Sequence, residues 1–106
     1  MAKIGIDIIE NSRINLSEKF FKKILHSDEL LILNKFSSEE AKIEFVSGRW
    51  AAKEAIIKCF EQPISMSKIN IVYINNKPVI LNDDLKGIEI SISHEKKYSV
   101  AVALNL

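Results

Sequence analysis

Asp7 is the first side chain whose type and position could do chemistry. It interrupts the β-branched run from Lys3 to Ile9, which predicts a buried strand. A carboxylate in a buried strand is costly unless it is paired with a cation or bound to a metal. Strand alternation places Gly5 on the same side as Asp7, where it would leave space beside the carboxylate. For this residue alone, an edge-strand acid that faces water or a lysine is an equally good interpretation.

Glu54 and Lys58 form a second candidate pair, on a segment that predicts a long helix. The chain from Glu39 to about Phe60 contains no proline and is apolar at most positions, a pattern typical of a buried helix. Spacing at i and i+4 puts Glu54 and Lys58 on one face of it, while Arg49 and Lys53 point together in another direction. Taken alone, the pair is better interpreted as a solvated ion pair worth about 0.3–0.5 kcal/mol.

The third polar group surrounds His94. Ser91 and Ser93 alternate with isoleucines before it, which predicts a half-buried strand with one polar face. A polar edge strand that ends in a turn histidine is the simpler interpretation. Because Ser93 and His94 are adjacent, a strand would point them to opposite sides, so a serine nucleophile activated by this histidine is a weak hypothesis. The sequence also lacks a G-x-S-x-G motif and a glycine-rich phosphate loop.

Basic side chains gather near one predicted helix. Three lysines surround a single acid, Glu18, and an arginine comes just before them; the four basic residues are Arg13, Lys19, Lys22 and Lys23. A solvated face is the simpler interpretation of such a cluster. The alternative is a docking surface for an acidic partner, recognised by charge.

Composition limits the class of protein. The chain has 106 residues, of which 47% are hydrophobic and 27% charged, which predicts one domain over residues 1–106 rather than a disordered chain. Its net charge of +1 does not favour nucleic acid or a membrane surface as a partner. Cys59 is the only cysteine, which excludes an internal disulfide and favours a reducing compartment. Without a visible signal peptide or spanning segment, a cytoplasmic protein is expected.

The predicted helices and strands must position these residues. Their order is typical of an α+β fold, with an N-terminal strand, one long buried helix with shorter helices, and an antiparallel sheet. Three helices are expected: Glu18–Leu25 capped by Ser17, Asp28–Phe36 capped by Ser27, and Glu39–Phe60 with a capping box at Ser37–Glu40. After the strand at Lys3–Ile9, four more are expected at Ile69–Ile74, Val79–Leu81, Ile88–Ser93 and Tyr98–Leu104, with a turn at Asn75–Lys77.

Together these motifs resemble holo-acyl-carrier-protein synthase, the small type of 4′-phosphopantetheinyl transferase. Gly5-Ile6-Asp7-Ile8 followed by Arg13 is similar to the family's G-[IV]-D-[IV]…R segment. The run from Gly48 to Lys58 is similar to its W-x-x-K-E-A-x-x-K helix. Ser91-Ile92-Ser93-His94, followed by Tyr98 to Ala103, is similar to its S-x-S-H hairpin. The order and approximate spacing agree over nearly the whole chain.

The resemblance implies a function and a set of roles. The family transfers the 4′-phosphopantetheine arm of coenzyme A to a serine of apo acyl carrier protein and releases adenosine 3′,5′-bisphosphate. It uses Mg²⁺, is typically a homotrimer with sites between subunits, and belongs to fatty acid biosynthesis. The implied catalytic residues are Asp7, Glu54 and Lys58, with Asp7 and Glu54 as metal ligands. Contacts to coenzyme A are implied for Arg49, Lys58, Ser93 and His94, and contacts to the carrier for Arg13, Lys19, Lys22 and Lys23.

Some features depart from the family pattern, and other functions stay open. The loop at Phe60–Ser65 has no glycine, and lysines stand at docking positions where the family often has arginine, which gives up bidentate geometry. The base that takes the serine proton is left open between a metal-bound water and a carboxylate such as Glu54. The alternatives are a degenerate member that binds coenzyme A without transfer and a small RNA-binding domain, against which the near-neutral charge argues.

Overall fold

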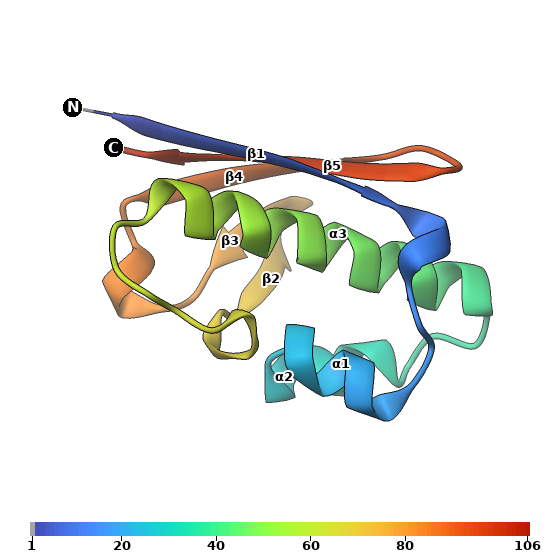
Figure 1. The fold of residues 1–106 in the computed structure, drawn as a ribbon. Coiled ribbons are helices and arrows are strands. Elements are labelled where there is room, and N and C mark those ends of the chain that lie inside the picture. The colour runs from blue at the N-terminus through green and yellow to red at the C-terminus, as the bar shows by residue number, and fades with distance from the viewer. Residues whose placement is uncertain (1) are drawn as a thin grey trace.

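A computed structural model describes residues 2–106 of the chain. Figure 1 shows a sheet laid along one side of a long helix, with two short helices on the helix's other side. The helices are α1 (Glu18–Ile24), α2 (Ser27–Leu33) and α3 (Glu39–Cys59). The strands are β1 (Lys3–Glu10), β2 (Ile71–Ile74), β3 (Lys77–Ile80), β4 (Ile88–His94) and β5 (Tyr98–Asn105), and short 3₁₀ turns lie at Asn11–Arg13, Met66–Lys68 and Asp83–Leu85.

The main sheet joins the two ends of the described chain. Its order is β1-β5-β4, and both pairings are antiparallel. The register sets Asp7 of β1 opposite Ala101 of β5, which lies opposite Ile92 of β4. The remaining strands, β2 and β3, form a separate antiparallel hairpin. The predicted α+β class is therefore confirmed, with the antiparallel strands divided between two sheets.

β1 is buried on one face only, so the expectation of a fully buried strand was wrong. The side that packs on α3 carries Gly5, Asp7 and Ile9, as the strand alternation predicted. The outer side carries Ile4, Ile6 and Ile8, which are 69%, 62% and 58% exposed. An exposed apolar strand face of this kind usually marks an interaction surface.

At the start of each α-helix the first backbone N–H groups have no partner within the helix. A side chain accepts a hydrogen bond from one of them in all three. Ser17 caps α1 through the Phe20 N–H, as predicted. Ser38 caps α3 through the Ala41 N–H, one residue after the first serine of the predicted Ser37–Glu40 capping box. The predicted cap of α2 was wrong by one residue, because His26 accepts from the Asp28 N–H and Ser27 is already helical. Among the helices of residues 2–106, none has the length and apolar character needed to cross a bilayer.

The β2–β3 hairpin turns on two asparagines rather than on a glycine. Asn75 and Asn76 have φ values of 51° and 63°, the left-handed conformation that a two-residue type I′ turn requires. Asparagine tolerates this conformation better than most residues with a side chain. The predicted turn is confirmed, although β2 starts at Ile71 rather than Ile69, and β3 runs from Lys77 to Ile80.

Small side chains on α3 form the centre of the core. Ala51, Ala52 and Ala55 are completely buried, and so are Val46 and Ile56. Alanine lets the helix axis approach both layers closely and costs little conformational entropy in a helix. The helix therefore lies against the sheet on one side and near α1 and α2 on the other (Figure 1).

Gly5 marks the closest approach of β1 to α3. A Cβ atom added to Gly5 would lie 2.0 Å from the backbone oxygen of Ala55 and 3.0 Å from the Cβ atom of Lys58. No side chain fits there without moving the strand away from the helix. The absence of a side chain at this position therefore sets how near Asp7 comes to the end of α3.

We predict that Gly5→Ala lowers the free energy of unfolding by about 1–3 kcal/mol, because the added methyl group overpacks the β1–α3 contact. Urea denaturation at neutral pH measures this change. Gly87→Ala is the matched control, since a Cβ there would meet nothing nearer than 3.7 Å and its φ is not positive. Equal midpoints for the two variants would contradict the close approach.

Candidate active site

The β1–α3 contact brings Asp7 to Lys58. The Lys58 Nζ lies 3.1 Å from Asp7 Oδ1 and donates a second hydrogen bond of 2.8 Å to the Ile6 carbonyl. The Asp7 side chain is 19% exposed and the Lys58 side chain 50%. Lys58 thus pairs with a residue far away in the sequence, instead of forming the solvated helical pair with Glu54. One strand and one helix together create a charged site open to solvent at one side.

Glu54 precedes Lys58 by one helical turn and follows directly on the buried Lys53. It is half-buried, and its neighbour Ala55 is the residue whose carbonyl faces Gly5. The carboxylates of Glu54 and Asp7 are therefore supplied by the same stretch of the β1–α3 contact. Within residues 2–106, no group of three or more histidine, cysteine, aspartate or glutamate side chains could hold a metal ion by itself.

This donor set fits Mg²⁺ bound together with a phosphate ligand. Mg²⁺ in proteins usually takes one or two carboxylates and completes its shell with waters and substrate phosphates. The ion pair with Lys58 uses Oδ1 of Asp7, and a carboxylate has lone pairs for several contacts. Asp7 and Glu54 are thus the residues that would hold the ion, and Lys58 is placed to contact a phosphate beside it.

A buried ionic network holds the middle of α3. Glu29 of α2 is fully buried and pairs with two cations of α3: its Oε1 contacts Lys53 Nζ, and its Oε2 lies 3.4 Å from Arg49 Nε. Lys53 Nζ also donates to the Ile24 carbonyl at 2.8 Å. Glu29 Oε2 accepts from the Ile71 N–H at 3.2 Å. One carboxylate therefore ties α2, α3 and the β2–β3 hairpin together.

Burial dominates the acid–base behaviour of this network. Desolvation lowers the pKa of Lys53 to about 8, although Glu29 acts in the opposite direction. Burial also lowers the pKa of Arg49, which Glu29 again partly offsets. The carboxylate is what allows two cationic side chains to remain inside the protein.

We predict that Glu29→Gln destabilises the protein more than Lys53→Met. The first change leaves two buried cations without a counter-ion, a loss of about 3–5 kcal/mol. The second replaces a buried ammonium group by an apolar chain of similar shape and leaves Glu29 paired with Arg49. Urea denaturation of both variants checks the order, and a larger loss for Lys53→Met would contradict this account of the network.

Arg49 and His94 line one cavity of about 510 Å³, between α3, the β2–β3 hairpin and the end of β4. The Arg49 guanidinium lies 4.1 Å from the ring centre of Phe45 and 5.2 Å from that of Tyr73. It donates to the Ile71 carbonyl at 3.2 Å. Burial lowers the pKa of His94, with Glu44 opposing and Arg49 reinforcing the shift. The cavity thus presents the Arg49 cation and the His94 imidazole beside aromatic walls.

Known proteins are similar to this chain in both sequence and fold. A family model described as the 4′-phosphopantetheinyl transferase superfamily matches residues 3–103. A holo-[acyl-carrier-protein] synthase from Mycoplasma capricolum is 57% identical over 101 residues, which cover 95% of this chain and 91% of that protein. This chain belongs to the 4′-phosphopantetheinyl transferase superfamily. The resemblance inferred from three motifs in the sequence is therefore confirmed.

Two solved structures of similar fold are complexes with coenzyme A. The holo-(acyl-carrier-protein) synthase of Bacillus anthracis, in complex with CoA (3′,5′-ADP), has a TM-score of 0.86 and 33% identity, and covers 96% of this chain and 93% of that one. The Helicobacter pylori enzyme in complex with coenzyme A has a TM-score of 0.73 and 26% identity, with coverages of 94% and 96%. The predicted phosphopantetheinyl transferase-like fold is therefore confirmed.

Ser93 is not brought together with the other residues expected at the nucleotide. On β4, His94 points toward α3, where its ring lies against Gly48, whereas the preceding Ser93 belongs to the outer face of the sheet. Its register partner is Val100, which also pairs with Ile8 of β1. Within one chain, Ser93 and Arg49 therefore lie on opposite sides of the main sheet.

The basic residues expected at the carrier lie at the surface around α1. Arg13 stacks 4.7 Å above the Trp50 ring, and Trp50 meets Phe20 edge to face. This stack connects α3 to α1, so Arg13 is held in one place while remaining exposed. Lys19 and Lys23 are exposed too, and Lys22 forms a surface ion pair with Glu18 at 3.4 Å. These four exposed basic side chains around α1 are called the basic rim below.

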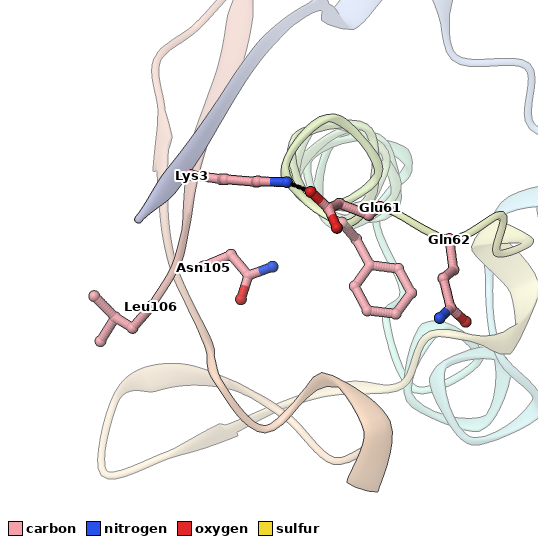
Figure 2. A pocket seen from close by; sticks show the side chains of 6 residues that line it. Lys3, Glu61, Gln62, Asn105 and Leu106 are labelled. Atoms are coloured by element: carbon pink, nitrogen blue, oxygen red, sulfur yellow. Dashed lines mark ion pairs between the residues drawn. The ribbon is translucent and has the colours of Figure 1, made fainter. Parts of the chain in front are cut away.

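A separate cavity of about 460 Å³ lies at the C-terminal end of α3. Figure 2 shows Lys3 of β1 and Glu61 directed toward each other there as an ion pair, with Gln62, Asn105 and Leu106 around the opening. Asn105 donates to the Cys59 carbonyl at 2.9 Å and so satisfies the end of the helix. In the part of the chain that the structure describes, this cavity is lined by none of the predicted site residues.

Motifs and spacing did not identify the polar residues that contact the site residues from neighbouring elements. Neither Glu29 nor Asn11 was among the residues expected at the site. The i, i+4 spacing of Arg49 and Lys53 was one available signal, since two cations on the buried side of a helix require an acid. Which acid meets them depends on the packing of α2 and could not be read from spacing.

Proposed function

We propose that this chain transfers the 4′-phosphopantetheine arm of coenzyme A to a serine hydroxyl of apo acyl carrier protein and releases adenosine 3′,5′-bisphosphate. The observation that supports this most is the Asp7–Lys58 pair, with Glu54 one turn away, at an open edge of the β1–α3 contact. Acid and cation together suit a pyrophosphate that must be neutralised and held. The proposal treats residues 1–106 as one phosphopantetheinyl transferase domain.

The reaction is a phosphoryl-type displacement. The serine oxygen of the carrier attacks the phosphorus next to the pantetheine arm and forms the new P–O bond. The bond to the bridging oxygen of the pyrophosphate breaks, and that oxygen leaves with adenosine 3′,5′-bisphosphate while the serine proton passes to a base. Lys58 binds a phosphate oxygen, and Asp7 and Glu54 are the side chains that would hold the divalent ion beside it. When bound, Mg²⁺ supplies charge neutralisation for the leaving phosphate.

The nucleotide end of coenzyme A is assigned to the cavity of Arg49 and His94. An arginine fixed between two aromatic rings keeps further N–H donors for a phosphate ester. His94 adds a second polar contact at the same opening. Because Ser93 lies on the outer face of β4, its contact to coenzyme A is assigned to a molecule bound at a neighbouring copy of the chain.

Substitution of Asp7 and of Glu54 by alanine tests the proposed site directly. We predict that Asp7→Ala and Glu54→Ala each abolish transfer and leave the fold intact, since both side chains reach solvent. Intact-mass spectrometry of apo acyl carrier protein, incubated with the variant, coenzyme A and Mg²⁺, measures the gain of the arm. Asp84→Ala, at an exposed acid, is the control.

Near-normal turnover of either variant would remove that residue from the metal site. Wild-type protein that binds coenzyme A but transfers nothing to the carrier would favour the catalytically degenerate member instead. A chelator added to the wild-type reaction should stop transfer, and persistent transfer would contradict the Mg²⁺ requirement.

The basic rim is assigned to the carrier. Arg13, Lys19, Lys22 and Lys23 surround the α1 side of the site, and their charge complements an acidic protein surface. Arg13 is pre-oriented by Trp50, whereas the lysines act as exposed point charges on flexible chains. Attraction of this kind acts over roughly 10 Å at moderate ionic strength and is screened by salt.

We predict that the double change Lys22→Glu and Lys23→Glu raises KM for the carrier by about tenfold, because each new glutamate would repel the acidic surface of the carrier instead of attracting it. KM for coenzyme A should stay unchanged. Lys35→Glu with Lys86→Glu makes the same change in net charge at exposed positions away from α1 and serves as the control. An unaltered KM for the carrier in the α1 variant would exclude this surface.

The proposed assembly is a homotrimer built on the outer face of the main sheet. Ile4, Ile6 and Ile8 are exposed there, and their register partners on β5 are Leu104, Val102 and Val100. A contiguous apolar face of this kind favours burial against a second copy. Ser93 lies on the same face, so a neighbouring copy would bring it near another chain's site.

We predict that Ile6→Glu reduces the assembly to single chains, because a charge at the centre of this face cannot be buried without a partner. Light scattering after size-exclusion chromatography gives the mass. Leu31→Glu is the control, since Leu31 of α2 is as exposed as Ile6. A wild-type protein that is already a single chain would contradict the trimer.

The setting of the reaction is assigned to the cytoplasm and to fatty acid biosynthesis. Cys59 is a free, buried thiol, as expected of a protein in a reducing compartment. Acyl carrier protein carries growing acyl chains only after it has received the phosphopantetheine arm, so the proposed reaction precedes lipid synthesis.

A further inference from the structure

Asn11, which follows β1, is the centre of a partly buried polar network. Its Oδ1 accepts hydrogen bonds from Ser47 Oγ at 2.8 Å and from Ser99 Oγ at 3.3 Å. Its Nδ2 faces the carbonyl oxygens of Glu95 and Lys96 at 3.4 and 3.2 Å. Ser47 of α3 and Ser99 of β5 are fully buried. The side chain of Asn11 therefore connects the helix, the sheet and the β4–β5 turn.

These contacts fix the orientation of the Asn11 amide. Carbonyl oxygens accept only, so the atom facing Glu95 and Lys96 must be the NH₂ group, and the atom facing the serines must be the oxygen. An amide oxygen carries no proton. Any hydrogen bond between this oxygen and Ser47 or Ser99 is therefore donated by the serine hydroxyl.

The orientation of Ser99 in turn fixes the proton on His94. Ser99 Oγ lies 2.8 Å from His94 Nδ1. A hydroxyl has one proton, so a Ser99 hydroxyl that donates to Asn11 Oδ1 at 3.3 Å cannot also donate to the ring. In that arrangement Ser99 accepts from the ring, so Nδ1 carries the hydrogen and Nε2 of the neutral imidazole carries the lone pair.

We propose that Asn11 and Ser99 are positioning residues that hold His94 in the Nδ1–H form, so that Nε2 is the nitrogen presented to coenzyme A. The coenzyme A half of the proposal rests on the proposed function. Gly48 keeps the ring in place, since a Cβ there would lie 2.5 Å from His94 Cε1 and 3.0 Å from Nε2. In this arrangement only Nε2 gains or loses a proton, and Nδ1 donates to Ser99 in both states.

The second histidine provides an internal reference. His26 Nδ1 accepts a hydrogen bond from the Asp28 N–H at 3.0 Å, so a neutral His26 carries its proton on Nε2. The two histidines of the chain are therefore expected as opposite tautomers in the same sample. Two-bond ¹H–¹⁵N correlation spectra of the imidazole nitrogens, recorded above the pH at which the rings titrate, distinguish them directly.

Two serine variants separate the positioning role from general stability. Ser99→Ala removes the acceptor of Nδ1, so His94 should populate both tautomers. Ser47→Ala removes an equally buried hydroxyl from the same amide oxygen but leaves Ser99 in place, so His94 should remain Nδ1–H. Asn11→Ala frees the Ser99 hydroxyl to rotate and should also mix the tautomers. His94 in the Nε2–H form in wild type, or unchanged in Ser99→Ala, would overturn the proposal.

Calorimetric titration with coenzyme A in Mg²⁺ tests the second half. Ser99→Ala should weaken binding about five- to tenfold, the effect of one misdirected hydrogen bond, while Ser47→Ala should match wild type. Equal affinity of Ser99→Ala and wild type, with the tautomer shifted, would overturn the role toward coenzyme A. If wild type binds no coenzyme A, the proposed function falls, and the spectra still decide whether His94 is held by Ser99.

Discussion

The contact between β1 and α3 is the constraint on which the rest of the site depends. Gly5 lets the strand lie against the Ala55 carbonyl, and no other residue fits at that distance. The same approach sets Asp7 beside Lys58, on the face of the strand that packs on α3. A metal site with two protein carboxylates is weak in isolation. Close packing of the two elements compensates, because it fixes the donors before a phosphate ligand arrives.

A second buried feature sets the opposite half of the site. Glu29 neutralises Arg49 and Lys53 on the side of α3 that faces α2, and it thereby fixes the Arg49 guanidinium at the wall of the cavity. Buried ion networks contribute little net stability compared with apolar packing, but they hold one geometry. The helix α3 thus carries Glu54 and Lys58, the residues of the proposed metal and phosphate site, at one end and a preoriented cation in its middle.

Elements with strong local signals were predictable from sequence. The β-branched run at Lys3–Ile9, the alternation in Ile88–Ser93 and the cap at Ser17 depend on neighbouring residues alone. The resemblance then related Asp7, Glu54 and Lys58 to one another across the chain. The partners of buried polar groups were not predictable: the pairing of Glu29 with Lys53, and of Asn11 with Ser99, depends on the packing of distant elements. Spacing within one helix or strand holds no information on such contacts.

The central claim is that Asp7 and Glu54, placed by the β1–α3 contact, bind a divalent ion together with coenzyme A. The most direct test follows the electron paramagnetic resonance signal of free Mn²⁺, used in place of Mg²⁺, as protein is added at a fixed concentration of coenzyme A. The account predicts that wild-type protein removes the free signal until one ion is bound per chain, and that Asp7→Asn leaves it largely unchanged. Equal uptake of Mn²⁺ by the two proteins would contradict the account.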